Sequence, residues 1–113
     1  MQKKTIEPSE WDTFLFEFSD RNTGRRARFE AFTSGGVAEE DEEASFQSVS
    51  IANHVVTVDR DTAKGGPIAD RIDDVRGIAV QFDSDGSENT MEFMDSNGDV
   101  TVLHFESMVD GES

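Results

Sequence analysis

Cysteine and tyrosine are absent from the sequence, and only two prolines and three lysines occur in 113 residues. The lack of cysteine excludes disulfide bonds, thiol catalysis and metal sites built on thiolates. Apolar runs are too short to span a bilayer, and residues 1–5 lack the apolar segment of a signal peptide. These absences favour a cytoplasmic protein that has no membrane partner.

Acidic residues outnumber basic ones by 25 to 10, which gives a formal charge of −15 at pH 7. Residues 1–30 are neutral overall, so the whole excess lies in residues 31–113. Such a field repels nucleic acids and attracts cationic partners. The scarcity of lysine is also consistent with adaptation to a saline cytoplasm, and a requirement for high salt in folding would support that explanation.

One domain is predicted to span residues 1–113, because this length is typical of a single folding unit. Loose tails are expected at residues 1–7 and 108–113. Residues 34–45 are expected to form an acidic loop, because five adjacent acids at 39–43 repel one another.

A helix is predicted from about Pro8 to Asn22, with Ser9 as its cap and Gly24 as a left-handed residue that ends it. Its apolar residues recur at the spacing of one helical face, and they are Trp11, Phe14, Leu15 and Phe18. Phe16 lies off this stripe, and the spacing leaves it either at the edge of the core or exposed.

Residues 76–106 read as three consecutive antiparallel strands with one shared apolar face. A turn at residues 96–98 pairs Met91 with Leu103, and a four-residue loop at 84–87 pairs Val80 with Met91 and Phe82 with Asn89. A one-residue slip in either hairpin would turn its apolar side chains outward.

Earlier strands are predicted at residues 25–33, 46–51 and 55–59, with a short strand or turn at 68–72 and a bulge near Phe46. The predicted fold class is therefore α+β. An N-terminal helix is expected to pack on a curled antiparallel sheet, or a partly closed barrel, of five to six strands that ends in a three-strand meander.

Two surface features are candidate contact sites. A cluster of basic residues in an acidic chain could bind an anion or the acidic half of a second copy, and it comprises Arg21, Arg25, Arg26 and Arg28. The alternative is that these arginines balance neighbouring acids and the helix terminus. The second face of the meander is partly apolar and could form a protein contact through Met94, Val100 and Val102.

The sequence contains no pattern that predicts catalytic, metal or cofactor-binding residues. The aspartate-rich turns at 83–87 and 95–99 lack the glycine and glutamate positions of a calcium-binding EF-hand. The two histidines, His54 and His104, would need to converge with a carboxylate to form a metal or general-base site.

The favoured function is a non-enzymatic interaction or regulatory module that binds a protein partner or itself, as a homodimer. One alternative is an acidic nucleic-acid mimic that occupies a basic cleft on another protein, although its acids cluster in loops instead of rows. Another alternative is a small hydrolase or isomerase that uses His54 or His104 with carboxylates.

Hydrophobic spacings and turns over about residues 11–105 form a distinctive pattern, made up of Trp11, Phe14, Phe18-Ser19, Gly24, Phe29-Glu30, Ile68, Ile72, Ile78, Met91-Glu92-Phe93, Asn97-Gly98, Leu103 and Phe105. In this pattern the chain resembles a family of small bacterial proteins known only as a domain of unknown function. The resemblance implies a shared fold and a cytoplasmic bacterial context, and it brings no activity and no catalytic residues. The chain departs from the family in having Asp70 where a histidine is usual, and in lacking prolines near Asp73 and Val75.

Overall fold

The computed structural model describes residues 2–32, 38–40, 44–62, 65–84 and 86–106. One short 3-10 helix, η1 (Pro8–Glu10), leads into the α-helix α1 (Trp11–Asn22). The strands are β1 (Gln2–Ile6), β2 (Arg26–Phe32), β3 (Ala38–Glu40), β4 (Ala44–Ala52), β5 (Val55–Thr62), β6 (Gly66–Ile72), β7 (Val75–Phe82), β8 (Glu88–Asp95) and β9 (Val100–Phe105).

The fold is α+β, with one N-terminal helix packed on a single antiparallel sheet. Eight strands follow one another in the order β1-β7-β8-β9-β2-β4-β5-β6, and β3 pairs with β2 beside this path. The prediction of a curled sheet or partly closed barrel of five to six strands is wrong, because the sheet is open and contains more strands. The added strands include β1, which replaces the expected loose N-terminal lead, and β3, which lies inside the expected acidic loop.

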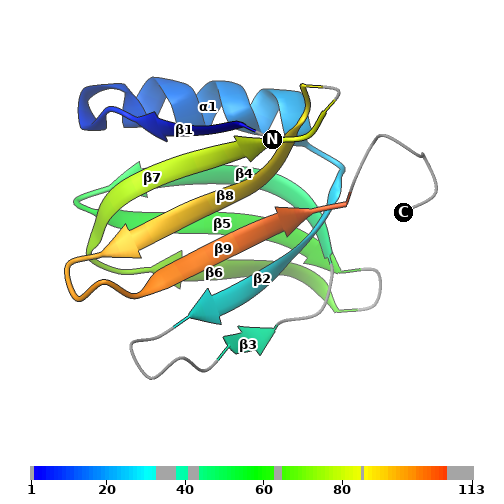
Figure 1. Ribbon diagram of the computed structural model, residues 1–113. Helices are drawn as coiled ribbons and strands as arrows, with labels where there is room; N and C mark the ends of the chain where they lie inside the picture. Colours follow the sequence, from blue (N-terminus) through cyan, green and yellow to red (C-terminus); the bar gives the residue numbers. More distant parts are fainter. Residues whose placement is uncertain (1, 33–37, 41–43, 63–64, 85, 107–113) are drawn as a thin grey trace.

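The open sheet has two halves that meet at a short junction. Among the described residues, β2 joins β4 through two residue pairs, Arg26 with Ser45 and Ala27 with Ala44. In Figure 1, β7, β8, β9 and β2 lie in front of β4, β5 and β6, with α1 along one side of both. The halves also meet where the backbone N–H of Val75 donates to the carbonyl of His54 at 2.8 Å. The core fills the space between them.

Aromatic rings from three elements form the centre of this core. The helical stripe predicted from the sequence faces inward, with Trp11, Leu15 and Phe18 buried. The ring of Phe18 lies 5.8 Å from that of Phe46 on β4 and 5.4 Å from that of Phe105 on β9. Such edge-on contacts suit the charge distribution of aromatic rings. They hold the helix against both halves of the sheet.

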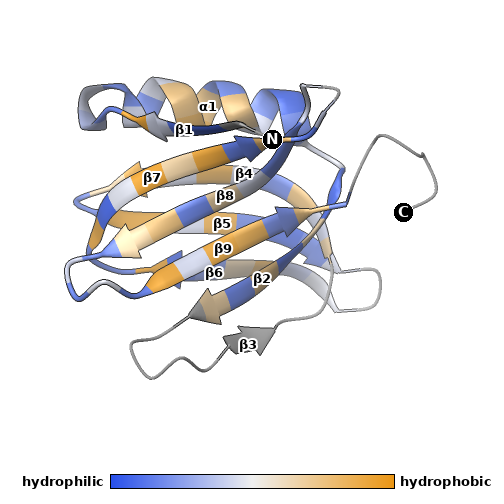
Figure 2. Ribbon diagram, in the orientation of Figure 1, coloured by the Kyte–Doolittle hydropathy of each residue, from blue (hydrophilic) through white to orange (hydrophobic). Residues whose placement is uncertain are grey.

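The meander β7-β8-β9 forms as predicted, with Ile78, Val80 and Met91 fully buried on its core face, and apolar residues occur on its second face as well (Figure 2). Met91 pairs with Leu103 and with Val80, as the turn lengths indicated. The predicted pairing of Phe82 with Asn89 is wrong. Phe82 pairs with Glu88, because the register shifts between Gln81 and Phe82.

The two ends of the helix differ in how well the sequence predicted them. The predicted Ser9 cap is absent, since η1 precedes α1 and no side chain caps either helix. Gly24 has the predicted positive φ of 96°. Its N–H donates to the carbonyl of Phe46 at 2.7 Å, so the chain leaves the helix beside β4 and continues into β2.

The β4–β5 turn lies between the strands predicted at 46–51 and 55–59, and β4 contains the irregularity predicted near Phe46. Asn53 and His54 both have positive φ, at 53° and 64°, as a two-residue hairpin turn requires. The predicted irregularity near Phe46 is confirmed by a register shift between Phe46 and Ser48. In the part of the chain that the structure describes, no helix is long and apolar enough to cross a membrane.

Candidate functional site

The second half of α1 is attached to the free edge of β4 by two hydroxyl groups. The Ser19 hydroxyl accepts from the Val49 N–H at 2.9 Å and lies 3.2 Å from the Val49 carbonyl oxygen. One turn later, the Thr23 hydroxyl lies 2.9 Å from the carbonyl oxygen of Gln47. Unpaired backbone N–H and C=O groups on a sheet edge can pair with another chain, and here the helix covers the edge and its hydroxyls hydrogen-bond to some of these groups.

The helix and the strand run past each other with nearly matched repeats. Four helical residues rise about 6.0 Å, and two strand residues rise about 6.6 Å. Thr23 therefore faces Gln47 and Ser19 faces Val49, and the next step of the repeat brings the turn of Leu15 and Phe16 level with Ile51. Neither Leu15 nor Phe16 carries a hydroxyl, so the side-chain hydrogen bonds to the strand edge stop here.

The backbone of Ile51 is left open by this arrangement. The hydrogen bonds between the Ser19 hydroxyl and the backbone of Val49 show that the N–H and carbonyl of Val49 point away from β5. Backbone groups repeat their direction every two residues, so those of Ile51 point to the same edge. Among the described residues, none hydrogen-bonds to them on that side.

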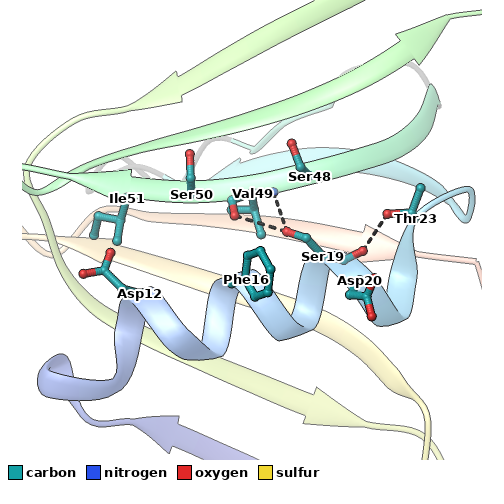
Figure 3. A pocket seen from close by; sticks show the side chains of 9 residues that line it. All are labelled: Asp12, Phe16, Ser19, Asp20, Thr23, Ser48, Val49, Ser50 and Ile51. Carbon is teal, nitrogen blue, oxygen red and sulfur yellow. Dashed lines mark hydrogen bonds between the residues drawn. The ribbon is translucent and has the colours of Figure 1, made fainter.

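A pocket of about 440 Å³ lies at this position between the helix and the strand (Figure 3). Phe16 stands over it, and its side chain is 75% exposed, whereas the other apolar residues of α1 are buried or half-buried. We call this pocket the α1–β4 groove, and it is lined by Asp12, Phe16, Ser19, Asp20, Thr23, Ser48, Val49, Ser50 and Ile51.

The groove combines an apolar centre with acidic ends. In Figure 3, Phe16 lies between Asp12 at one end of the groove and Asp20 at the other. Both aspartates are exposed, and among the residues that line the groove none is basic. A smaller hollow of about 260 Å³ shares Asp12 and Ile51 with the groove and continues to the β4–β5 turn at His54.

Arg21 and Arg25, two of the four candidate arginines, bind groups near the end of the helix. Arg21 donates two hydrogen bonds to the Glu88 carboxylate at 3.2 and 2.6 Å, and Asn22 donates a third at 2.8 Å. Donating to the Glu88 carboxylate raises the pKa of Arg21 above its usual value. Arg25 donates to the carbonyls of Glu88 at 2.6 Å and Glu106 at 2.7 Å. These contacts fix the end of α1 to β8 and β9.

The remaining two arginines lie on β2 and point away from the core strip of that strand. Arg26 is exposed and lies 3.6 Å from the Glu106 carboxylate. Arg28 is half-buried and pairs in register with His104 of β9. The arrangement does not bring the four arginines together as one exposed surface, and their role in binding an anion or a second copy stays a prediction.

The predicted apolar contact face lies on the outer side of β8 and β9. Met94 pairs directly with Val100, and both are half-buried. Val102 is buried. Beside them, Glu92 forms an ion pair with Lys3 at 2.9 Å. The structure brings these three apolar residues together, and their role as a contact surface stays a prediction.

The two histidines have separate partners. The His54 Nδ1 atom lies 3.1 Å from the carbonyl oxygen of Val75, and its ring packs edge-on against Trp11. The His104 Nε2 atom lies 2.8 Å from the Glu30 carboxylate on the neighbouring strand. Within the described ranges, no group of three or more acidic or histidine side chains could hold a metal ion.

No protein-family model matches the chain, and no curated protein matches it in sequence. The resemblance to a bacterial family of unknown function therefore stays a prediction. The groove itself was not predicted from the sequence. Its one signal was Phe16, an aromatic residue off the buried stripe with an aspartate four residues away on each side.

Proposed function

We propose that this protein is a non-enzymatic interaction module that binds a protein partner through the α1–β4 groove. The observation that carries the proposal is the exposure of Phe16. A large apolar side chain that is 75% in solvent contributes little to folding, yet it stands over a pocket with a partly apolar lining. Apolar patches next to polar rims are typical of protein-binding surfaces.

The polar groups around Phe16 support binding more than catalysis. The groove offers two carboxylates, several hydroxyls and an open stretch of strand edge. His54 lies at the far end of the neighbouring hollow, where its ring already contacts Trp11 and the Val75 carbonyl. Aromatic anchors surrounded by polar groups dominate the binding energy of many protein interfaces.

The test is site-specific photocrosslinking in the organism that encodes the chain. A photoreactive phenylalanine analogue at position 16 is expected to form a covalent adduct with one partner protein. The matched control places the same analogue at Thr13, which is exposed on α1 and does not line the groove. Adducts that form equally from both positions, or from neither, would contradict the proposal.

The mass of the adduct also separates the kinds of partner. An adduct of twice the chain mass would identify a second copy of this protein as the partner. An adduct of any other mass would identify a different protein. Light scattering of the purified chain at low and high salt then gives the state of self-association independently of the crosslink.

A further inference from the structure

We infer that the α1–β4 groove receives an arginine or lysine side chain from an extended segment of a basic partner protein. This inference rests on the proposed function and specifies the chemistry of its ligand. The cation would lie over the Phe16 ring between Asp12 and Asp20, and the main chain of the segment would lie beside Ile51.

The cation-binding part follows from the helix. Residues four apart are neighbours on a helical surface, so Asp12 and Asp20 flank Phe16 on one face. The face of an aromatic ring attracts cations. Arginine and lysine also carry long apolar stems, which suit Phe16, Val49 and Ile51 in the lining.

The net charge of the whole chain also favours a basic ligand. With −15 at neutral pH, the surface attracts a basic segment and repels an acidic one before contact. The chain's own Arg21 and Arg25 already hydrogen-bond to Glu88, so they do not supply the cation from a second copy. A second copy carries the same charge of −15 and is repelled, so the occupant is a different, basic protein.

The extended conformation of the segment follows from the strand edge. The N–H and carbonyl of Ile51 point out of β4 into the groove region, where the helix supplies no hydroxyl. An extended segment beside β4 can bond to both groups, as strands do when they add to a sheet edge. The free edge is short, so the pairing covers Ile51 and the turn that follows, and the side chain in the groove supplies the selectivity.

The experiment titrates the labelled full chain with a blocked pentapeptide that has arginine at its centre, valine on each side of it and serine at both ends. Two-dimensional NMR is expected to show saturable shifts of the Ile51 amide and the Phe16 ring protons. The matched peptide has citrulline in place of arginine, which keeps the shape and removes the charge. We expect it to bind at least about fivefold more weakly.

Variants of the chain assign the contacts. Phe16→Leu is expected to weaken binding of the arginine peptide about two- to fivefold, since it removes only the aromatic face. The pair Asp12→Asn and Asp20→Asn is expected to weaken it about fivefold and to reduce its salt dependence. Thr13→Ala serves as the control, with no change.

The outcomes separate this inference from the proposed function. Equal binding of the arginine and citrulline peptides would overturn the cation site and leave an apolar docking groove. Absence of shifts at millimolar peptide, together with a crosslink from position 16, would overturn the inference and retain the proposed function. Shifts at Phe16 without any at Ile51 would overturn the extended pairing.

Discussion

The guanidinium carbon of Arg60 lies 4.7 Å from the centre of the Phe29 ring, and the Arg60 side chain is fully buried. The same group donates hydrogen bonds to the Ala27 carbonyl at 3.2 Å and to the Asp70 carboxylate at 3.0 Å. One side chain on β5 therefore contacts β2 and β6. It bridges the two halves of the sheet next to their short junction.

Because the charge of Arg60 is buried, we predict that substitution of Asp70 lowers stability only while Arg60 is present. Asp70→Asn is expected to lower the free energy of unfolding by about 2 kcal/mol, because it weakens the compensation of a desolvated cation. In an Arg60→Met background the same change is expected to cost close to nothing. A double-mutant cycle by urea denaturation measures the difference. Equal costs of Asp70→Asn in both backgrounds would contradict the pairing.

Ser19→Ala is expected to lower the free energy of unfolding by about 1 to 2 kcal/mol, since the Val49 N–H loses its hydrogen-bond partner. Hydrogen exchange of the Val49 amide should accelerate more than that of other β4 amides. Thr13→Ala, on the exposed side of the same helix, is the control. An unchanged Val49 exchange rate would show that Ser19 does not hold the helix to this edge.

Phe16 and Phe18 are predicted to differ sharply in their contributions to stability. Phe18→Ala is expected to cost about 3 to 5 kcal/mol, because its ring is fully buried among Phe46 and Phe105. Phe16→Ala is expected to change stability by no more than about 0.5 kcal/mol. Thermal and urea unfolding of the two variants give the comparison. A large cost at Phe16 would show that this ring serves the fold.

Asp74 in the β6–β7 link is predicted to titrate below its usual range. Hydrogen bonds from Ser96 and then from Arg76 lower its pKa from the ordinary 3.8. A depressed pKa in the folded state means that the contribution to stability is present above the unfolded pKa and is lost as pH falls through the folded value. NMR titration of the carboxyl gives this pKa, and Ser96→Ala should raise it toward 3.8. A pKa that stays at its usual value in the unsubstituted chain would contradict the contact.

Sequence periodicity predicted the helix and the meander because both depend on neighbours along the chain. The inward stripe of α1 follows from the spacing of Trp11, Leu15 and Phe18, and the pairing of Met91 with Leu103 follows from the turn at 96–98. The strand β1 was missed, since an edge strand with lysines in it carries little apolar alternation. Pairing with β7, over 70 residues away, makes it a strand.

The sequence alone determined that this is an acidic α+β chain with an amphipathic helix, a three-strand meander and one aromatic residue off the helical stripe. Turn geometry and side-chain periodicity act over a few residues, so they can be read locally. Tertiary structure decided that the sheet is open, that Arg21 and Arg25 bind Glu88, and that Phe16 stands over a groove. The groove depends on where the hydroxyls of Ser19 and Thr23 meet a strand edge that lies 30 and 24 residues further along the chain, and no local pattern encodes that contact.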